Sequence, residues 1–285
     1  MEGRARAAGA GTVLNALATH RGCAFAIDQY TTAKVKLEPN SPVTGRVIDH
    51  PEADTMLIEQ CVKKTIERYG SEESLGGTVT TSSDIPMASG LKSSSAAANA
   101  TVLATLAALE RANEVDPLEA TRIGVAAARA AEVTVTGAFD DASASMLGGI
   151  TMTDNACDEL LFHKPFEREV LVYTPPAKAF SADADVERCH RLAPIANTIE
   201  SLAMDGKYEA AMTVNGFAYA AALGFSPNRM LEALPSVEGV SLSGTGPSTV
   251  AIGTETVLDE VASVWAEAPG SVTKTTTTNK GAYTI

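Results

Sequence analysis

The chain has 285 residues, of which 45% are hydrophobic and 20% are charged, as in a soluble globular protein. Its formal net charge of −13 argues against a nucleic-acid partner, because nucleic-acid binding requires a basic face that neutralises phosphates. No segment offers the roughly 18 uninterrupted apolar residues of a membrane span, and the N-terminus is a poor match to a secretion signal, so we expect no membrane partner and a cytoplasmic location.

Apolar periodicity predicts a mixture of strands and helices along the whole chain. In the first half we expect strands within 23–38 and 78–82, and helices over 54–69, 94–112 and 117–132. In the second half we expect strands over 169–173 and 272–277, strand-like segments on both sides of 243–247, and helices over 186–202 and 208–223. This mixture predicts an α+β fold with two lobes, 1–154 and 155–285, and a substrate cleft between them.

The segment between the strand 78–82 and the Ala-rich helix has the properties of a phosphate-binding loop. A helix start presents unpaired N–H groups and carries about half a positive charge, so it attracts anions. Glycine lets the backbone approach a phosphate closely, and serine hydroxyls can cap the helix, bind phosphate or ligate Mg²⁺. Lys92 either contacts phosphate or is solvated. The predicted ATP-binding residues here are Pro86, Met87, Ala88, Ser89, Gly90, Leu91, Lys92, Ser93, Ser94, Ser95 and Ala96.

Two other segments of small residues carry candidate site residues. Gly244, Thr245 and Gly246 form either a tight turn or a loop that packs closely against another backbone or a ligand. Asp140 and Asp141 are adjacent carboxylates among small residues. One could face a substrate hydroxyl while the other orients it, or Asp140 could cap a helix whose first turn holds Asp141.

The loop pattern Pro-x-x-x-Gly-Leu-x-Ser-Ser-x-Ala at 86–96 resembles the second motif of the GHMP kinases. The segment 243–248 resembles their third motif, which closes over the nucleotide-binding loop. The resemblance implies a two-lobed fold with the active site in the cleft, and ATP-dependent phosphorylation of a small-molecule hydroxyl with Mg²⁺. Gly9 and Gly22 keep the spacing of the first motif, but Ala10 stands where mevalonate-kinase-type members carry Lys. The missing charge must then come from another group, such as Arg4, Arg21 or Lys92, or from Mg²⁺.

The resemblance also implies roles for three carboxylates. In mevalonate kinase and galactokinase the catalytic Asp precedes a Gly by seven residues, and counting back from Gly148 gives Asp141. Matching the Asp-Asn-Ala run of the family favours Asp140 instead, which we keep as the alternative. Glu132 is either a charged helix terminus or, near the place of an acidic Mg²⁺ ligand in mevalonate kinase, a ligand for Mg²⁺. Ser94 is the second candidate ligand for Mg²⁺.

Segments spread over most of the chain resemble the archaeal-type shikimate kinase branch of this superfamily: 11–16, 24–28, 134–142 and 214–216. This resemblance implies transfer of the ATP γ-phosphoryl group to the 3-hydroxyl of shikimate, with Asp141 accepting the proton. Thr12 and Asn15 are the implied substrate contacts, and Arg21 and Arg191 are candidates for the ring carboxylate. The alternatives are homoserine or mevalonate phosphorylation, or a GHMP-fold protein that binds without catalysis.

Overall fold

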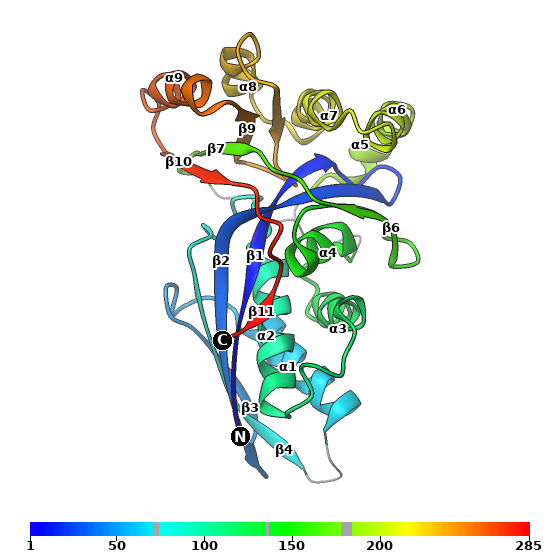
Figure 1. Cartoon of the computed structure of the whole chain (residues 1–285), viewed down its shortest axis with the longest axis vertical. Helices are drawn as coiled ribbons and strands as arrows, with labels where there is room; N and C mark the ends of the chain where they lie inside the picture. The colour runs from blue at the N-terminus through cyan, green and yellow to red at the C-terminus, as the bar shows by residue number, and fades with distance from the viewer. Residues whose placement is uncertain (71–73, 135–136, 178–183) are drawn as a thin grey trace.

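A computed structural model describes residues 1–70, 74–134, 137–177 and 184–285 of the chain. These residues form a seven-stranded and a four-stranded sheet, each with helices packed on it (Figure 1). The expected α+β class is therefore confirmed. Within the described ranges, no helix has the length and apolar character that crossing a membrane would require.

The larger sheet is mainly antiparallel and contains the two longest strands. Its main path runs in the order β11 (Tyr283–Thr284), β1 (Glu2–Leu14), β2 (Arg21–Pro39), β4 (Leu75–Ser83) and β3 (Val43–Val47). β5 (Ile150–Asp154) pairs with the first part of β2, and β6 (Glu159–Lys164) pairs with β5. One long strand, β2, therefore connects the β5–β6 hairpin to the rest of the sheet.

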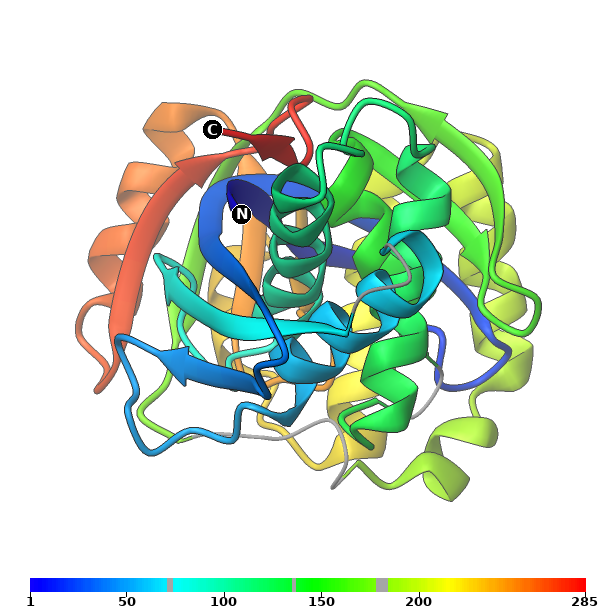
Figure 2. The ribbon, with the colours of Figure 1, turned by 90° about the horizontal axis from the view of Figure 1, so that it is seen from below.

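Four helices lie on one side of this sheet, with α2 packed against its central strands and α3 packed on the other helices (Figure 2). They are α1 (Met56–Tyr69), α2 (Ser93–Ala108), α3 (Pro117–Ala130) and α4 (Phe139–Leu147). Small residues bring α2 close to β1, since a Cβ atom at Gly3 would lie 2.1 Å from the Ala104 carbonyl oxygen. The helix predicted to reach residue 112 ends earlier, because Glu110 adopts φ +59° and Arg111 N–H donates to Leu106 O at 2.8 Å.

The smaller sheet and its helices form the upper part of the molecule in Figure 1. Its strands lie in the order β10 (Ser271–Thr276), β7 (Glu169–Thr174), β9 (Thr249–Gly253) and β8 (Gly239–Leu242). Its helices are α5 (Val186–His190), α6 (Ala193–Met204), α7 (Tyr208–Leu223), α8 (Asn228–Ala233) and α9 (Glu255–Trp265). The prediction of a single helix over 186–202 was wrong, because Pro194 lies in the first turn of α6 and cannot continue a preceding helix.

Aromatic side chains connect the larger sheet to a helix of the smaller sheet's lobe. Phe25 on β2 and Phe166 before β7 have ring centroids 5.5 Å apart, and Phe166 meets Tyr208 of α7 edge-on at 5.7 Å. Phe25 is fully buried and Phe166 nearly so. These contacts fix the position of α7 relative to the larger sheet, and so the relative position of the loops that both lobes contribute to the site.

The end of the chain returns to the larger sheet. β11 pairs antiparallel with β1, with Ala5 opposite Thr284, and both chain ends lie in the lower part of Figure 1. β6 and β11 thus belong to the first sheet although both follow residue 154 in sequence. The lobe boundary at 154/155 stays a prediction.

Candidate functional site

The predicted phosphate loop joins β4 to α2 through residues with left-handed backbone. Gly90 has φ +84°, and Lys92, which immediately precedes α2, has φ +65°. Ser89 Oγ donates to Pro86 O at 2.7 Å, which closes the turn. Among the described residues, no side chain caps the first turn of α2. The N–H groups of this turn are therefore available to an anion, as the serine run predicts.

The loop at 243–248 packs directly on the phosphate loop. Ser243 Oγ donates to Gly90 O at 2.9 Å, and Ser248 N–H donates to Ser89 O at 3.1 Å. A Cβ atom at Gly90 would lie only 2.2 Å from the Ser243 carbonyl oxygen. Glycine at 90 is thus required both by its φ angle and by the approach of the second loop.

Thr12 and Asn15, at the end of β1 and just after it, fix the second loop. Thr12 Oγ1 accepts from Gly244 N–H at 2.8 Å, and Asn15 Nδ2 donates to Gly244 O at 2.8 Å. The backbone N–H of Asn15 donates to Asn215 Oδ1 at 2.9 Å, and Tyr219 OH donates to Asn15 O at 2.8 Å. These bonds tie β1, α7 and the Gly244 loop together at the site.

The two adjacent carboxylates lie in the first turn of α4, and Ala138, not Asp140, precedes the helix. Asp140 is only 4% exposed. Its Oδ1 accepts from Asn155 Nδ2 at 2.7 Å, and its N–H donates to Asn155 Oδ1 at 3.1 Å. Asn155 lies in the turn after β5 and was not among the site residues predicted from the sequence. These two bonds hold the Asp140 side chain toward the turn after β5.

Asp141 faces Lys92 across the start of α2. Lys92 Nζ lies 2.9 Å from Asp141 Oδ1, and the two side chains are 9% and 14% exposed. Burial and the neighbouring charge of Asp140 raise the pKa of Asp141 to about 7, although Lys92 opposes the rise. Asp141 thus has the environment expected of a general base that works near neutral pH.

A cavity of about 720 Å³ joins these features. Both carboxylates, the start of α2 and the Gly244 loop line it. The predicted site residues in its lining are Asn15, Met87, Ala88, Gly90, Lys92, Ser93, Ser94, Ser95, Glu132, Asp140, Asp141, Gly244 and Thr245. Those outside the lining are Thr12, Arg21, Pro86, Ser89, Leu91, Ala96, Arg191 and Gly246.

The predicted arginines are engaged elsewhere. Arg21 Nη1 lies 3.2 Å from Asp154 Oδ2, and the side chain of Arg191 is 78% exposed and lies 3.8 Å from Glu187. The structure does not bring these residues together with Asp141, and their predicted role toward a substrate carboxylate stays a prediction. Val135 and Thr136, part of the segment used for the resemblance, lie outside the described residues.

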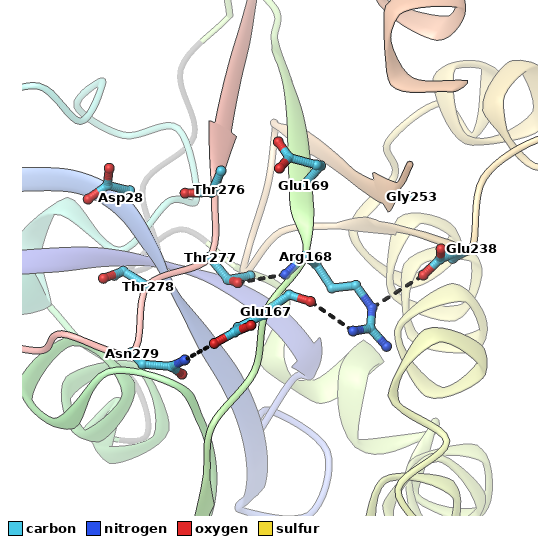
Figure 3. A pocket seen from close by; sticks show the side chains of 10 residues that line it. All are labelled: Asp28, Glu167, Arg168, Glu169, Glu238, Gly253, Thr276, Thr277, Thr278 and Asn279. Atoms are coloured by element: carbon cyan, nitrogen blue, oxygen red, sulfur yellow. Dashed lines mark hydrogen bonds and ion pairs between the residues drawn. The ribbon is translucent and has the colours of Figure 1, made fainter. Parts of the chain in front are cut away.

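A second cavity, of about 880 Å³, lies where the two sheets meet (Figure 3). Its charged lining is mostly acidic, with Asp28, Glu167, Glu169 and Glu238. Its arginine, Arg168, is paired with Glu238 at 3.2 Å. The described residues that line this second cavity include none from the first turn of α2 and none from the Gly244 loop, so the Asp141 cavity is the better candidate for a nucleotide.

Gly22 supplies a test of how rigidly Asp140 is held. A Cβ atom at position 22 would lie 2.4 Å from Asp140 Oδ2, so Gly22→Ala should displace this buried carboxylate and lower the free energy of unfolding by about 1–3 kcal/mol. Gly253→Ala is a matched control in another strand, because its Cβ would lie no closer than 3.6 Å to any neighbour. Urea unfolding of both variants measures the difference, and equal stabilities would contradict the described packing of Asp140 on Gly22.

Comparison with known proteins identifies relatives over the whole length. A family model described as GHMP kinases N terminal domain matches residues 56–149. A protein named shikimate kinase from Halobacterium salinarum is 58% identical over 285 residues, covering 100% of both chains. Another of that name from Methanosarcina mazei is 50% identical and covers 100% of this chain and 97% of its own.

Solved structures show the same fold at low identity. A homoserine kinase from Cytophaga hutchinsonii has a TM-score of 0.76 at 17% identity, covering 100% of this chain and 97% of its own. The mevalonate kinase of Methanococcus jannaschii has a TM-score of 0.75 at 15% identity, covering 97% of each chain. These similarities confirm the predicted fold.

Proposed function

Because the chain belongs to the GHMP kinase family, we propose that it transfers the γ-phosphoryl group of ATP to the 3-hydroxyl of shikimate. The observation that carries the transfer step is the convergence of an uncapped helix start and Asp141 on one cavity. Identities of 58% and 50% over the whole chain to proteins named shikimate kinase support the choice of acceptor.

The phosphates of ATP would lie against the first turn of α2. Gly90 and the three serines line the cavity there, and the backbone can approach a phosphate closely where residue 90 has no Cβ. The overall charge of −13 opposes binding of an anion, so the local N–H groups and helix dipole must supply the attraction. The Gly244 loop closes this end of the cavity and holds the phosphate loop in place.

Hard oxygen donors in the same lining fit Mg²⁺. Ser94 and Glu132 both line the cavity, and Mg²⁺ in proteins is commonly held by one or two carboxylates together with substrate phosphates. We propose that the Ser94 hydroxyl and the Glu132 carboxylate hold the ion. When bound, Mg²⁺ would neutralise charge on the phosphate oxygens during transfer.

Asp141 would orient the acceptor hydroxyl and accept its proton. It is the less buried of the two carboxylates, and Asp140 is committed to Asn155. Phosphoryl transfer depends mainly on positioning and on charge stabilisation. Placing Asp141 beside the phosphate loop would bring the acceptor hydroxyl near the γ-phosphorus.

The raised pKa of Asp141 predicts the acidic limb of the pH profile. The carboxylate is the active form, so kcat/KM should fall as the pH is lowered through about 7 and the group becomes protonated. Asp141→Asn should remove this limb from its residual activity. Kinetics from acidic to mildly alkaline pH test the prediction, and a wild-type profile that stays flat well below neutrality would contradict it.

An acceptor screen tests the proposed function. Purified protein with ATP and Mg²⁺ would be offered shikimate, homoserine and mevalonate separately, with ADP release and the phosphorylated product both measured. We expect product from shikimate and none from the other two. Phosphorylation of homoserine or mevalonate with no turnover of shikimate would overturn the proposed acceptor while leaving the kinase family unchanged.

A further inference from the structure

The charged lining of the Asp141 cavity is unbalanced. Among the described lining residues, Lys92 is the single Lys or Arg. Six carboxylates share the lining with it: Asp49, Glu52, Asp54, Glu132, Asp140 and Asp141. The position of the Lys92 ammonium group therefore strongly influences the electrostatic potential inside the cavity.

Lys92 contacts Asp141 from a constrained position. It adopts φ +65° directly before α2, a backbone conformation that is uncommon outside glycine. Its Nζ lies 2.9 Å from Asp141 Oδ1, and both side chains are largely shielded from water. A shielded ion pair interacts more strongly than a surface pair.

The Lys92 side chain passes close to Gly244 on its way to Asp141. A Cβ atom at Gly244 would lie 2.6 Å from Lys92 Nζ, so the absence of a side chain at 244 makes room for the ammonium group. Gly244 is itself fixed by bonds from Thr12 and Asn15. The loop that covers the phosphate loop thus also confines Lys92 beside Asp141.

Neither position 10, where related kinases carry Lys, nor the alternative cations Arg21 and Arg4 supply a charge to Asp141. Ala10 on β1 is fully buried in a small cluster with Ala24 and Ala144, which leaves no space for a long side chain at that position. Arg21 is paired with Asp154 and Glu200, and Arg4 is exposed near the start of β1. The cation that serves Asp141 comes from the phosphate loop and not from β1.

We propose that Lys92 is a positioning residue that holds and orients the Asp141 carboxylate for the acceptor hydroxyl, and that it acts through Asp141 and not by binding nucleotide. This proposal rests on the proposed function for its kinetic consequence. Its physical basis is electrostatic, because Asp140 is adjacent and Glu132 lines the same cavity. Without the ammonium group, two neighbouring carboxylates in a shielded site would favour protonation of Asp141.

A double-mutant cycle tests whether Lys92 acts through Asp141. Lys92→Met keeps the length of the side chain and should lower kcat by about 10²–10³-fold, the loss typical of removing one preorganised electrostatic contact, with little change in the Kd for ADP. In Lys92→Met/Asp141→Asn the loss should equal that of Asp141→Asn alone. Losses that multiply, or a Kd for ADP that rises in parallel with the loss of kcat, would overturn the proposal.

Two further variants control for folding and charge. Lys207→Met removes a lysine from an exposed ion pair with Asp205 and should leave kcat and thermal stability unchanged. Lys92→Arg retains the charge and should keep more activity than Lys92→Met. If Lys92→Arg were as slow as Lys92→Met although both fold, a role for the charge would be refuted.

A titration that needs no acceptor separates this proposal from the proposed function. Infrared difference spectra of the carboxyl band, with Asp141→Asn to assign it, give the midpoint of Asp141 protonation in the absence of substrates. The midpoint should lie at higher pH in Lys92→Met than in the wild type. An unchanged midpoint would contradict the proposed role of Lys92 even if shikimate is phosphorylated, whereas a shifted midpoint with no turnover of shikimate would count against the proposed function alone.

Discussion

Asp141→Asn should lower kcat by about 10²–10⁴-fold, the usual contribution of a general base, and leave the Kd for ATP nearly unchanged. The amide keeps the size of the side chain but removes the negative charge and the proton acceptor. Because a loose phosphoryl-transfer transition state depends more on positioning than on a base, the retained shape would place the loss toward the lower end of this range. Asp141 lies beside Lys92 and opens to the cavity, so its replacement should affect chemistry first.

Asp140→Asn provides the matched comparison. Asp140 accepts from Asn155 through Oδ1 in a buried site, and an amide oxygen there replaces a charge-assisted hydrogen bond by a weaker neutral one, so we expect a loss of about 1 kcal/mol in the free energy of unfolding. Its effect on kcat should be smaller than that of Asp141→Asn. Steady-state kinetics at saturating ATP, with urea unfolding of both variants, distinguish the two carboxylates. A nearly wild-type Asp141→Asn enzyme beside an inactive, stable Asp140→Asn enzyme would reverse the assignment.

Gly90→Ala should weaken ADP binding and lower the free energy of unfolding together. The new Cβ would lie 2.2 Å from the carbonyl oxygen of Ser243 and 2.9 Å from that of Gly246. Because both atoms are backbone, one of the two loops must move, which typically costs about 1–3 kcal/mol. The displacement would occur where the phosphates are proposed to bind, so affinity should fall more than stability alone explains.

Gly206→Ala controls for backbone strain. Gly206 has φ +78°, close to the +84° of Gly90, but a Cβ atom there has no neighbour within 4 Å. Both variants therefore place an alanine at positive φ, with a similar loss of stability. Only Gly90→Ala also forces the two loops apart. Calorimetric ADP binding and thermal unfolding of both proteins isolate that difference. Equal ADP affinities in the two variants would show that the contact between the loops is not needed for nucleotide binding.

Local sequence signals predicted the parts of the site that depend on neighbouring residues. The segment 82–108 carries the end of a strand, then a glycine and a serine run, and then an Ala-rich helix. The structure has a loop followed by α2 in that order. The helix 54–69 and the strand 169–173 were confirmed for the same reason, since their apolar periodicity is local. The approach of a phosphate to Gly90 stays a prediction.

Contacts between distant segments could not be read from those signals. Lys92 and Asp141 are 49 positions apart in the sequence and meet because α2 and α4 pack on the same sheet. Asn155 reaches Asp140 from the turn after β5. β1, rich in Ala and Gly, has low intrinsic strand preference and is stabilised by β2, β11 and α2.

The most direct test of a single cavity for ATP and acceptor is a crystal structure with ADP and shikimate bound. We expect the ADP phosphates against Gly90 and the serines at the start of α2, and the 3-hydroxyl of shikimate within hydrogen-bond distance of an Asp141 carboxylate oxygen. Nucleotide phosphates more than one helix turn from this loop, or shikimate bound away from Asp141, would contradict the proposed site.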